Sequence, residues 1–296
     1  MSSSISISDS PAAQHLSREK ATPITPALYV VATPIGNLRD ITLRALDVLA
    51  GVDHILAEDT RQSAKLLAAY DIKTPLSAYH DHNAASRIPK ILERLKAGES
   101  IALISDAGTP LVSDPGFKLV REAAKAGIEI IPLPGASAPL AALVKSGLPS
   151  DCFLFAGFMP PKSAARQSAM AAFASVKATL IFFETGQRIT KMLGDALKVY
   201  GDREAVLTRE LTKQYEEARR GTISELLESA SQDKPRGEIV VLIGPPQESE
   251  TWSEADVMAA LKKQISDLGL KRASTEIAEL AGWPKRDVYQ LALTLK

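Results

Sequence analysis

The chain has 296 residues, a length that favours more than one domain, and its 45% hydrophobic content is typical of a protein with a sizeable core. No apolar run approaches the roughly 18 residues of a membrane-spanning helix, the N-terminus lacks signal-peptide features, and the single cysteine, Cys152, excludes an internal disulfide. We therefore expect a cytoplasmic protein without a membrane partner. With 35 basic and 35 acidic residues the net charge is zero, which argues mildly against nucleic-acid binding, although a neutral total can conceal a local basic patch.

The first half of the chain alternates short apolar strands with amphipathic helices. Residues 1–26 are rich in Ser, Pro and Ala without periodicity, and we predict a disordered tail there. Strands are then predicted at residues 28–32, 55–57, 101–104 and 128–131, and helices at 43–50, 63–69, 88–95 and 117–126. Asp40 or Thr42 is a plausible N-cap of the first helix. This alternation indicates a mostly parallel sheet covered on both faces, which binds ligands at the carboxyl ends of its strands.

The second half contains another α/β pattern and then a small helical one. Strands are predicted at residues 153–155, 179–183, 205–207 and 238–243, and apolar spacing after Trp252 marks two helices before Pro284 opens a last one through Leu295. The predicted fold is therefore two α/β domains with mostly parallel sheets and a helix-turn-helix-like unit. Its predicted parts are a tail (1–26), an N-terminal domain (27–140), a C-terminal domain (150–246) and the helical unit (251–296).

The loops that follow strands hold the candidate chemistry. The sequence lacks a phosphate-binding P-loop, a dinucleotide fingerprint and a nucleophile elbow. Pro34 and Gly36 form either an ordinary turn or one that a ligand approaches closely. The loop 105–116 has two Asp-containing turns, more than one connection needs, which favours a site over a surface loop. Ser137 would cap the next helix or bind a ligand.

Charged residues at other strand ends leave two interpretations open. The stretch 58–61 would anchor a polar ligand or cap a helix, and Glu184 with Arg188 would line a cleft or form a structural ion pair, as would the stretch 209–213. His80 and His82 have no third His or Cys nearby, so we expect no metal and instead a polar loop, or capping by Asn83.

Several of these strings together resemble the tetrapyrrole-methylase-like superfamily of S-adenosylmethionine enzymes, and within it the branch of 16S rRNA cytidine 2'-O-methyltransferases. The most specific are Thr33-Pro34-Ile35-Gly36-Asn37-Leu38 and Ser105-Asp106-Ala107-Gly108-Thr109-Pro110; the stretches 57–61, 80–83, 113–116, 132–135, 209–213 and 237–238 also fit. The resemblance covers residues 27–296. One departure lies after Glu184, where the family usually has Ser-Pro-His before its Arg and this chain has Thr185-Gly186-Gln187, so no role of that His is carried over.

The resemblance implies S-adenosyl-L-methionine as cofactor, a cleft between two α/β domains as its site, a homodimer, and 16S rRNA within the small ribosomal subunit as partner. The family's cofactor contacts would map onto Pro34, Ile35, Gly36, Asp106, Ala107, Gly108, Thr109, Pro110, Ser137, Phe155, Gly157 and Phe158.

Methyl transfer to a ribose oxygen needs a general base, because a 2'-hydroxyl is a weak acid. We expect Glu184 or Glu58 to accept the proton, and Lys213 or Arg188 to stabilise the developing oxyanion. For RNA binding we expect contributions from Arg61, Lys65, Lys162, Arg166, Lys285 and Arg286. Two alternatives remain: a small-molecule tetrapyrrole methylase of the same superfamily, and a non-catalytic ribosome-assembly binder.

Overall fold

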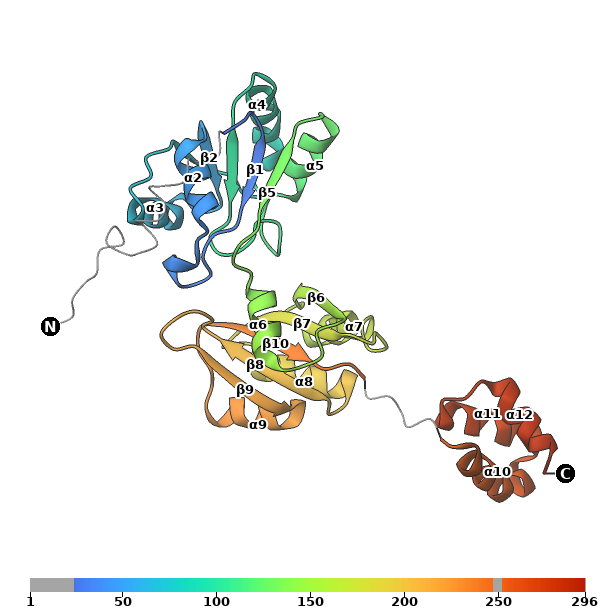
Figure 1. Ribbon diagram of the computed structural model, residues 1–296. Coiled ribbons are helices and arrows are strands. Elements are labelled where there is room, and N and C mark those ends of the chain that lie inside the picture. Colours follow the sequence, from blue (N-terminus) through green and yellow to red (C-terminus); the bar gives the residue numbers. More distant parts are fainter. Residues whose placement is uncertain (1–23, 247–251, 296) are drawn as a thin grey trace. The chain divides into compact units, whose positions relative to one another are not determined.

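The computed structural model describes residues 24–246 and 252–295 (Figure 1). Contacts between residues divide the chain into two compact units, and the boundary along the chain lies between Pro245 and Pro246. The first unit contains two five-stranded sheets and the second contains three helices. Nearly all of the expected N-terminal tail, residues 1–23, lies outside the described residues.

The first sheet is parallel throughout, as the alternating pattern predicts. In the order β3-β2-β4-β1-β5 it holds β1 (Leu28–Val31), β2 (His54–Ala57), β3 (Leu76–Ala78), β4 (Ile101–Ile104) and β5 (Ile130–Leu133). The short strand β3 was not among the predicted strands, and β5 begins two residues later than predicted. Because all five strands run the same way, their carboxyl-end loops gather at one edge of the sheet.

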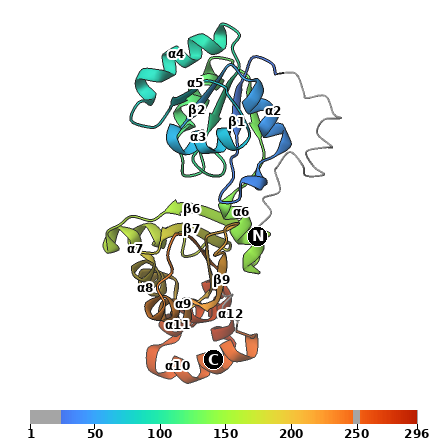
Figure 2. The same cartoon turned by 90° about the vertical axis from the view of Figure 1, so that its left-hand side faces the viewer.

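Helices cover both faces of this sheet (Figure 2). Val31 and Ile55 pack with α2 (Leu43–Gly51) and α3 (Thr60–Ala69), whereas Leu28 and Leu56 of the same strands pack with α4 (Ala84–Lys96) and α5 (Phe117–Lys125). Successive side chains of a strand point to opposite faces, so strands buried on both sides are apolar throughout. Thr42 is the N-cap of α2 and its hydroxyl accepts from the Ala45 N–H, which decides between the two expected caps.

The second sheet is mixed rather than mostly parallel, and our expectation is wrong for it. In the order β6-β7-β10-β8-β9 it holds β6 (Phe153–Phe158), β7 (Thr179–Thr185), β8 (Glu204–Arg209), β9 (Glu217–Thr222) and β10 (Glu238–Ile243). Strands β6 and β7 are parallel, and the other three pairings are antiparallel. The connection 210–216 is shorter than the crossover of about a dozen residues that parallel neighbours need. Polar β9 lacks apolar alternation, and the sequence analysis missed it.

The two faces of the second sheet have different coverings. Helices α7 (Ser163–Ala171), α8 (Ile189–Tyr200) and α9 (Ile223–Gln232) pack on one face. The other face carries α6 (Ala138–Ser146) and, in the same apolar cluster, Ile35 from the loop after β1. The carboxyl-end loops of the first sheet therefore contact the second sheet through a buried apolar side chain.

The second unit is a bundle of α10 (Glu254–Leu268), α11 (Leu270–Ala281) and α12 (Lys285–Leu293). Val257, Ile277 and Val288, one from each helix, form its core with other apolar residues. Pro284 precedes α12 as expected. Within residues 24–246 and 252–295, no helix is long and apolar enough to cross a membrane.

Arg166 is a buried structural residue, which corrects its expected role in RNA binding. Its side chain is 2% exposed and binds Asp195 of α8 at 2.7 Å, and its guanidinium also donates to the carbonyl oxygens of Pro160 and Pro161. Ser163 and Gln167 donate to the same Asp195 carboxylate, so the ion pair is fully hydrogen-bonded. With its donors directed inward, Arg166 offers no surface to a phosphate.

We expect Arg166→Ala to lower the free energy of unfolding by about 3–5 kcal/mol, because removal of one partner leaves a buried charge uncompensated. Urea denaturation followed by circular dichroism measures this loss. Lys162→Ala, on an exposed neighbour, is the matched control and should stay within about 0.5 kcal/mol of the wild type. A loss of RNA affinity in Arg166→Ala at unchanged stability would contradict the structural assignment.

Candidate functional site

A cavity of about 210 Å³ lies where the loops of the first sheet meet the second sheet. Its first-sheet side consists of the loop after β1, the loop between β4 and α5, and the start of α6. Its second-sheet side consists of the ends of β6 and β7, the residue after Glu210, and the start of β10. The lining residues are Ile35, Ala107, Gly108, Thr109, Val112, Ser113, Asp114, Ser137, Ala138, Pro139, Phe158, Phe183, Glu184, Thr185, Leu211, Glu238, Ile239 and Val240.

Half of the residues expected around the cofactor line this cavity, namely Ile35, Ala107, Gly108, Thr109, Ser137 and Phe158. Asp106 points elsewhere, because its Oδ1 accepts from the Asp59 N–H at 2.9 Å. Phe155 packs edge-on against Phe183 behind the cavity wall, and Gly157 sits at a β-bulge with φ of 64°. Pro34, Gly36 and Pro110 flank lining residues without lining the cavity.

Backbone contacts fix the loops that form the first-sheet side. Thr33 and Gly108 exchange backbone hydrogen bonds of 2.8 and 2.9 Å, and the Thr33 hydroxyl donates to the Ser105 carbonyl. Gly108 has φ of 79°, a conformation that favours glycine. The Thr109 hydroxyl then donates to the Ala136 carbonyl, which ties this loop to the segment before α6. Ser137 is the N-cap residue of α6, yet its side chain makes no capping hydrogen bond.

Gly36 brings the loop after β1 against the segment 211–213. A Cβ at this position would lie 2.9 Å from the Leu211 carbonyl oxygen and 2.8 Å from the Thr212 hydroxyl. Next to it, the Asn37 N–H donates to that hydroxyl at 3.0 Å. The close neighbour of this turn is therefore a protein segment, and the contact of a ligand with Gly36 stays a prediction.

Three carboxylates, those of Glu58, Asp106 and Asp114, lie near one another at the carboxyl edge of the first sheet. Burial and the nearby charges of Asp114 and Asp106 raise the pKa of Glu58 to about 7. Burial also raises the pKa of Asp114 to about 6, although a hydrogen bond from Ser105 opposes it. Asp59 behaves differently: it caps α3, and hydrogen bonds from Arg61 lower its pKa to about 2.

Glu184 is the buried carboxylate on the second-sheet side. It is 2% exposed, its Oε1 accepts from the Thr185 N–H, and its Oε2 meets no hydrogen-bond partner in the described part of the chain. Burial raises its pKa, and the hydrogen bond from Thr185 and the charge of Arg188 oppose the shift. Glu184 is also one of the residues that line the cavity, and a buried carboxylate oxygen without a partner can accept a proton or a hydrogen bond.

The other expected catalytic residues lie around this cavity without lining it. Arg188 Nε lies 3.2 Å from Glu184 Oε1, and its guanidinium donates to the Met159 carbonyl. Lys213 binds Glu238 at 2.8 Å and Glu210 at 3.3 Å. Glu58 is held beside the cavity residue Asp114. Both cations are therefore engaged with carboxylates.

The sequence analysis did not name Asp114, Phe183, Leu211 and several apolar residues individually as cavity residues. Asp114 stands in the second of the two unusually rich turns, which was a usable signal. Leu111 and Ser113 before it have positive φ values of 73° and 67°, a conformation that a turn imposes on side chains other than glycine. Leu211 lies within the stretch 209–213 that the sequence offered as a cleft lining, whereas nothing in the local sequence distinguishes Phe183 from an ordinary core residue.

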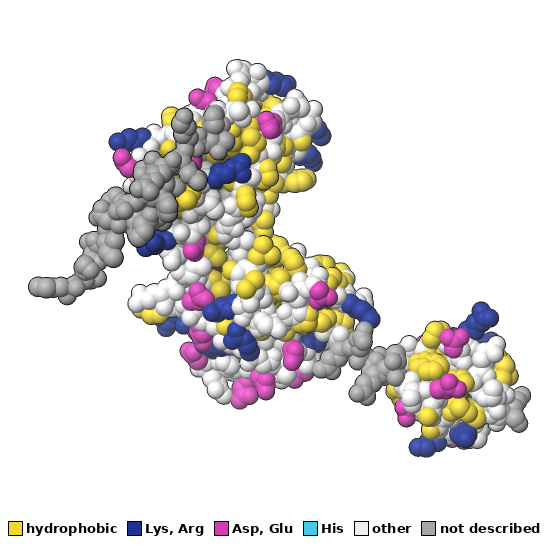
Figure 3. Space-filling view, in the orientation of Figure 1, with side chains coloured by type: hydrophobic (Ala, Val, Ile, Leu, Met, Phe, Trp, Pro, Cys, Tyr) yellow, Lys and Arg dark blue, Asp and Glu magenta, His cyan; other side chains and the backbone are white. Residues whose placement is uncertain are grey.

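The exposed cations expected to bind RNA are dispersed. Arg61 pairs with Asp59, Lys65 donates to Gln62, and Lys162 precedes α7. Lys285 and Arg286 are exposed at the start of α12 in the second unit. On the face drawn in Figure 3, basic and acidic side chains are interspersed rather than separated into one large basic surface.

Comparison with known proteins identifies the family of this chain. The profile of the tetrapyrrole (corrin/porphyrin) methylases matches residues 27–227, and that of the RsmI C-terminal HTH domain matches residues 253–296. A protein of Mesorhizobium japonicum named ribosomal RNA small subunit methyltransferase I is 50% identical over 93% of this chain and 94% of its own length. The chain belongs to that family of methyltransferases. The protein of the same name from Haemophilus influenzae is 47% identical over 92% of this chain and 98% of its own length.

Solved structures support the fold. Diphthine synthase has a TM-score of 0.58 at 15% identity, over 89% of this chain and 99% of that one. The uroporphyrin-III-C-methyltransferase of Thermus thermophilus has a TM-score of 0.53 at 21% identity, over 73% and 93%. At identities this low, the likeness establishes the fold alone, and it confirms the expected α/β fold.

The raised pKa of Glu58 predicts a pH-dependent effect on stability. A carboxyl with a raised folded-state pKa binds its proton more tightly when folded, so its contribution is present at low pH and is lost as pH rises toward 7. Glu58→Gln should therefore be more stable than the wild type at pH 8, and this difference should vanish near pH 4. Urea denaturation across this range measures it. Asp59→Asn removes a carboxyl whose pKa is lowered, so this variant should be less stable than the wild type at pH 8. A pH-independent difference in stability for Glu58→Gln would contradict the assignment.

Proposed function

We propose that this protein transfers a methyl group from S-adenosyl-L-methionine to the 2'-oxygen of a cytidine in the decoding region of 16S rRNA. The relatives named ribosomal RNA small subunit methyltransferase I support the RNA substrate. The observation that carries the chemistry is Glu184, a residue that lines the cavity between the two sheets and whose buried Oε2 has no hydrogen-bond partner in the described part of the chain.

The residues around this cavity suit the cofactor. S-adenosyl-L-methionine combines an aromatic base, a ribose and a charged amino acid, and it supplies the activated methyl group. Phe158 and Phe183 offer apolar contact, whereas Ala107 and Gly108 bring backbone close to the cavity. Asp114 and the unpaired hydroxyl of Ser137 supply polar groups.

Glu184 fits the general base better than Glu58 does. Glu184 lines the cavity and Glu58 does not. Burial raises the pKa of Glu184, which strengthens it as a base for a hydroxyl proton. Removal of that proton leaves the ribose oxygen as the nucleophile. Phe183 and Leu211 contribute apolar walls to the cavity beside this carboxylate.

Arg188 acts on this base, and Lys213 is held in a separate network. The contact of Arg188 with Glu184 orients the carboxylate and leaves its Oε2 free. Lys213 bridges Glu210 and Glu238, of which Glu238 lines the cavity, so it stabilises the wall opposite the first sheet. Either cation would stabilise an oxyanion only by exchanging a carboxylate partner for it.

The proposal includes the surroundings in which the reaction takes place. The substrate is the small ribosomal subunit or its RNA, and the protein works in the cytoplasm as a homodimer. Leu140 and Val144 on α6 are 49% and 86% exposed, and such side chains suit a subunit interface.

We expect radiolabel from S-adenosyl-L-methionine to enter small-subunit particles, and Glu184→Gln to lower this rate by about 100-fold or more, since a general base contributes about 10²–10⁴-fold. Cofactor binding, measured by calorimetry, should be normal in the variant. Glu58→Gln should stay close to the wild type. A target carrying a 2'-deoxycytidine should accept no label.

Label in a porphyrinoid instead would make the protein a small-molecule methylase, and label in neither would favour an assembly factor without catalysis. A Glu184→Gln rate within threefold of the wild type would remove Glu184 from the role of base.

Deletion of residues 251–296 should weaken binding of small-subunit RNA while cofactor affinity is unchanged. The deleted unit has its own core, and Lys285 and Arg286 are exposed on it. Filter binding and calorimetry measure the two affinities. Equal RNA affinity after deletion would make this unit structural.

A further inference from the structure

The second sheet carries a second and larger cavity, of about 950 Å³, whose lining includes residues from three stretches that the sequence singled out, 184–188, 209–213 and 237–238. It lies beside the end of β7, where Thr185 lines both cavities, and the loop from α9 to β10 forms its opposite side. Its lining residues are Thr185, Gly186, Gln187, Arg209, Arg219, Gln232, Asp233, Lys234, Pro235, Arg236 and Gly237. Four of them are cations and one is a carboxylate, in a chain whose net charge is zero.

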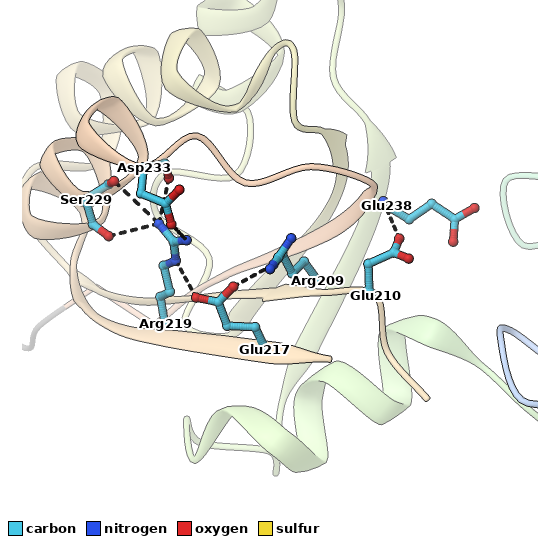
Figure 4. A network of polar contacts seen from close by, with 7 residues as sticks. All are labelled: Arg209, Glu210, Glu217, Arg219, Ser229, Asp233 and Glu238. Atoms are coloured by element: carbon cyan, nitrogen blue, oxygen red, sulfur yellow. Dashed lines mark hydrogen bonds and ion pairs between the residues drawn. The ribbon is translucent and has the colours of Figure 1, made fainter. Parts of the chain in front are cut away.

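Two of these cations are held rigidly (Figure 4). Glu217 accepts from Arg209 at 2.5 Å and from Arg219 at 2.7 Å. Arg219 also donates to the Asp233 carboxylate and to the Ser229 hydroxyl, which ties β9 to the end of α9. These contacts raise the pKa of Arg219 and lower that of Glu217. The network therefore fixes the walls of the cavity.

The other two cations are free. Lys234 and Arg236 are exposed and make no hydrogen bond or ion pair with the residues that the structure describes. Pro235 between them is buried against Gly186, where a Cβ would overlap the Pro235 carbonyl oxygen. The turn Thr185–Gln187, which departs from the family pattern, therefore packs against the loop that carries Lys234 and Arg236.

We propose that this cavity binds the phosphodiester backbone of the substrate RNA next to the nucleotide that enters the Glu184 cavity. Unpaired Lys and Arg side chains on an anchored loop favour phosphate oxygens, and Arg adds a bidentate geometry. Thr185 lines both cavities, so they adjoin at the end of β7, as adjacent nucleotides of one RNA strand require. Gln187 adds an amide that can bind a sugar or base edge. This assignment rests on the proposed function, since it presumes an RNA substrate.

The test compares Lys234→Ala/Arg236→Ala with the matched control Lys90→Ala/Lys96→Ala. The control removes the same charge, two positive side chains, from a site away from both cavities, because Lys90 and Lys96 are exposed on α4 and line neither cavity. We expect the loop variant to bind in-vitro-transcribed 16S rRNA at least tenfold more weakly, with an unchanged Kd for S-adenosyl-L-methionine. The slope of log K against log salt should fall by roughly 1.5, because each lost phosphate contact contributes about 0.7–0.9.

Gly186→Ala is a second variant that keeps every charge but displaces the loop, and it should weaken RNA binding in the same direction. RNA affinity and salt slope equal to those of the control in both variants would overturn the proposal. So would loss of binding to assembled small subunits with unchanged binding to naked RNA, since that result assigns the surface to a ribosomal protein. Loss of RNA affinity in a protein that transfers no methyl group would uphold this site and refute the proposed function.

Discussion

The cavity between the two sheets depends on how closely the loop after β1 approaches the segment after β8. Gly36 makes this approach possible, because any side chain there would collide with the backbone and side chains of residues 211–213. Ile35 beside it then enters the apolar cluster on the second sheet, and the Asn37 N–H donates to Thr212. One glycine, one apolar side chain and one hydrogen bond thereby fix the two sides of the cavity against each other.

That packing also determines the electrostatics of the site. Carboxylates are brought close together at the edge of the first sheet, and burial with mutual repulsion raises the pKa values of Glu58 and Asp114. Glu184 on the opposite side is buried more completely, but it has a cation, Arg188, beside it. Burial therefore raises the pKa on both sides, and only for Glu184 does a neighbouring arginine oppose the shift.

The sequence predicted well what depends on local pattern. Apolar strands such as Ile101–Ile104 and the Gly- and Pro-rich loops behind them identified the first sheet and its functional edge. Strand β9 was missed because an edge strand of half-buried polar side chains has no apolar alternation. The antiparallel pairing of β8, β9 and β10 depends on connection length, which the apolar pattern does not show. Arg166 was misassigned, since nothing near it in sequence shows that Asp195, 29 residues later, would enclose it. Phe183 became a site residue only through tertiary packing.

The departure from the family's usual residues at Gly186 and Gln187 is also explained by tertiary packing. Taken alone, a missing histidine suggests a loss, because a ring nitrogen that could have bound a ligand is absent. In the fold, Gly186 allows the carbonyl of Pro235 to lie against it, which positions the 233–237 loop over the turn. A bulky residue at 186 would force that loop outward and change where Lys234 and Arg236 stand. The net charge of the chain is therefore a poor guide to its partners. The contact between Gly186 and Pro235 places two unpaired cations, Lys234 and Arg236, at one cavity, although basic and acidic residues are equal in number over the whole chain.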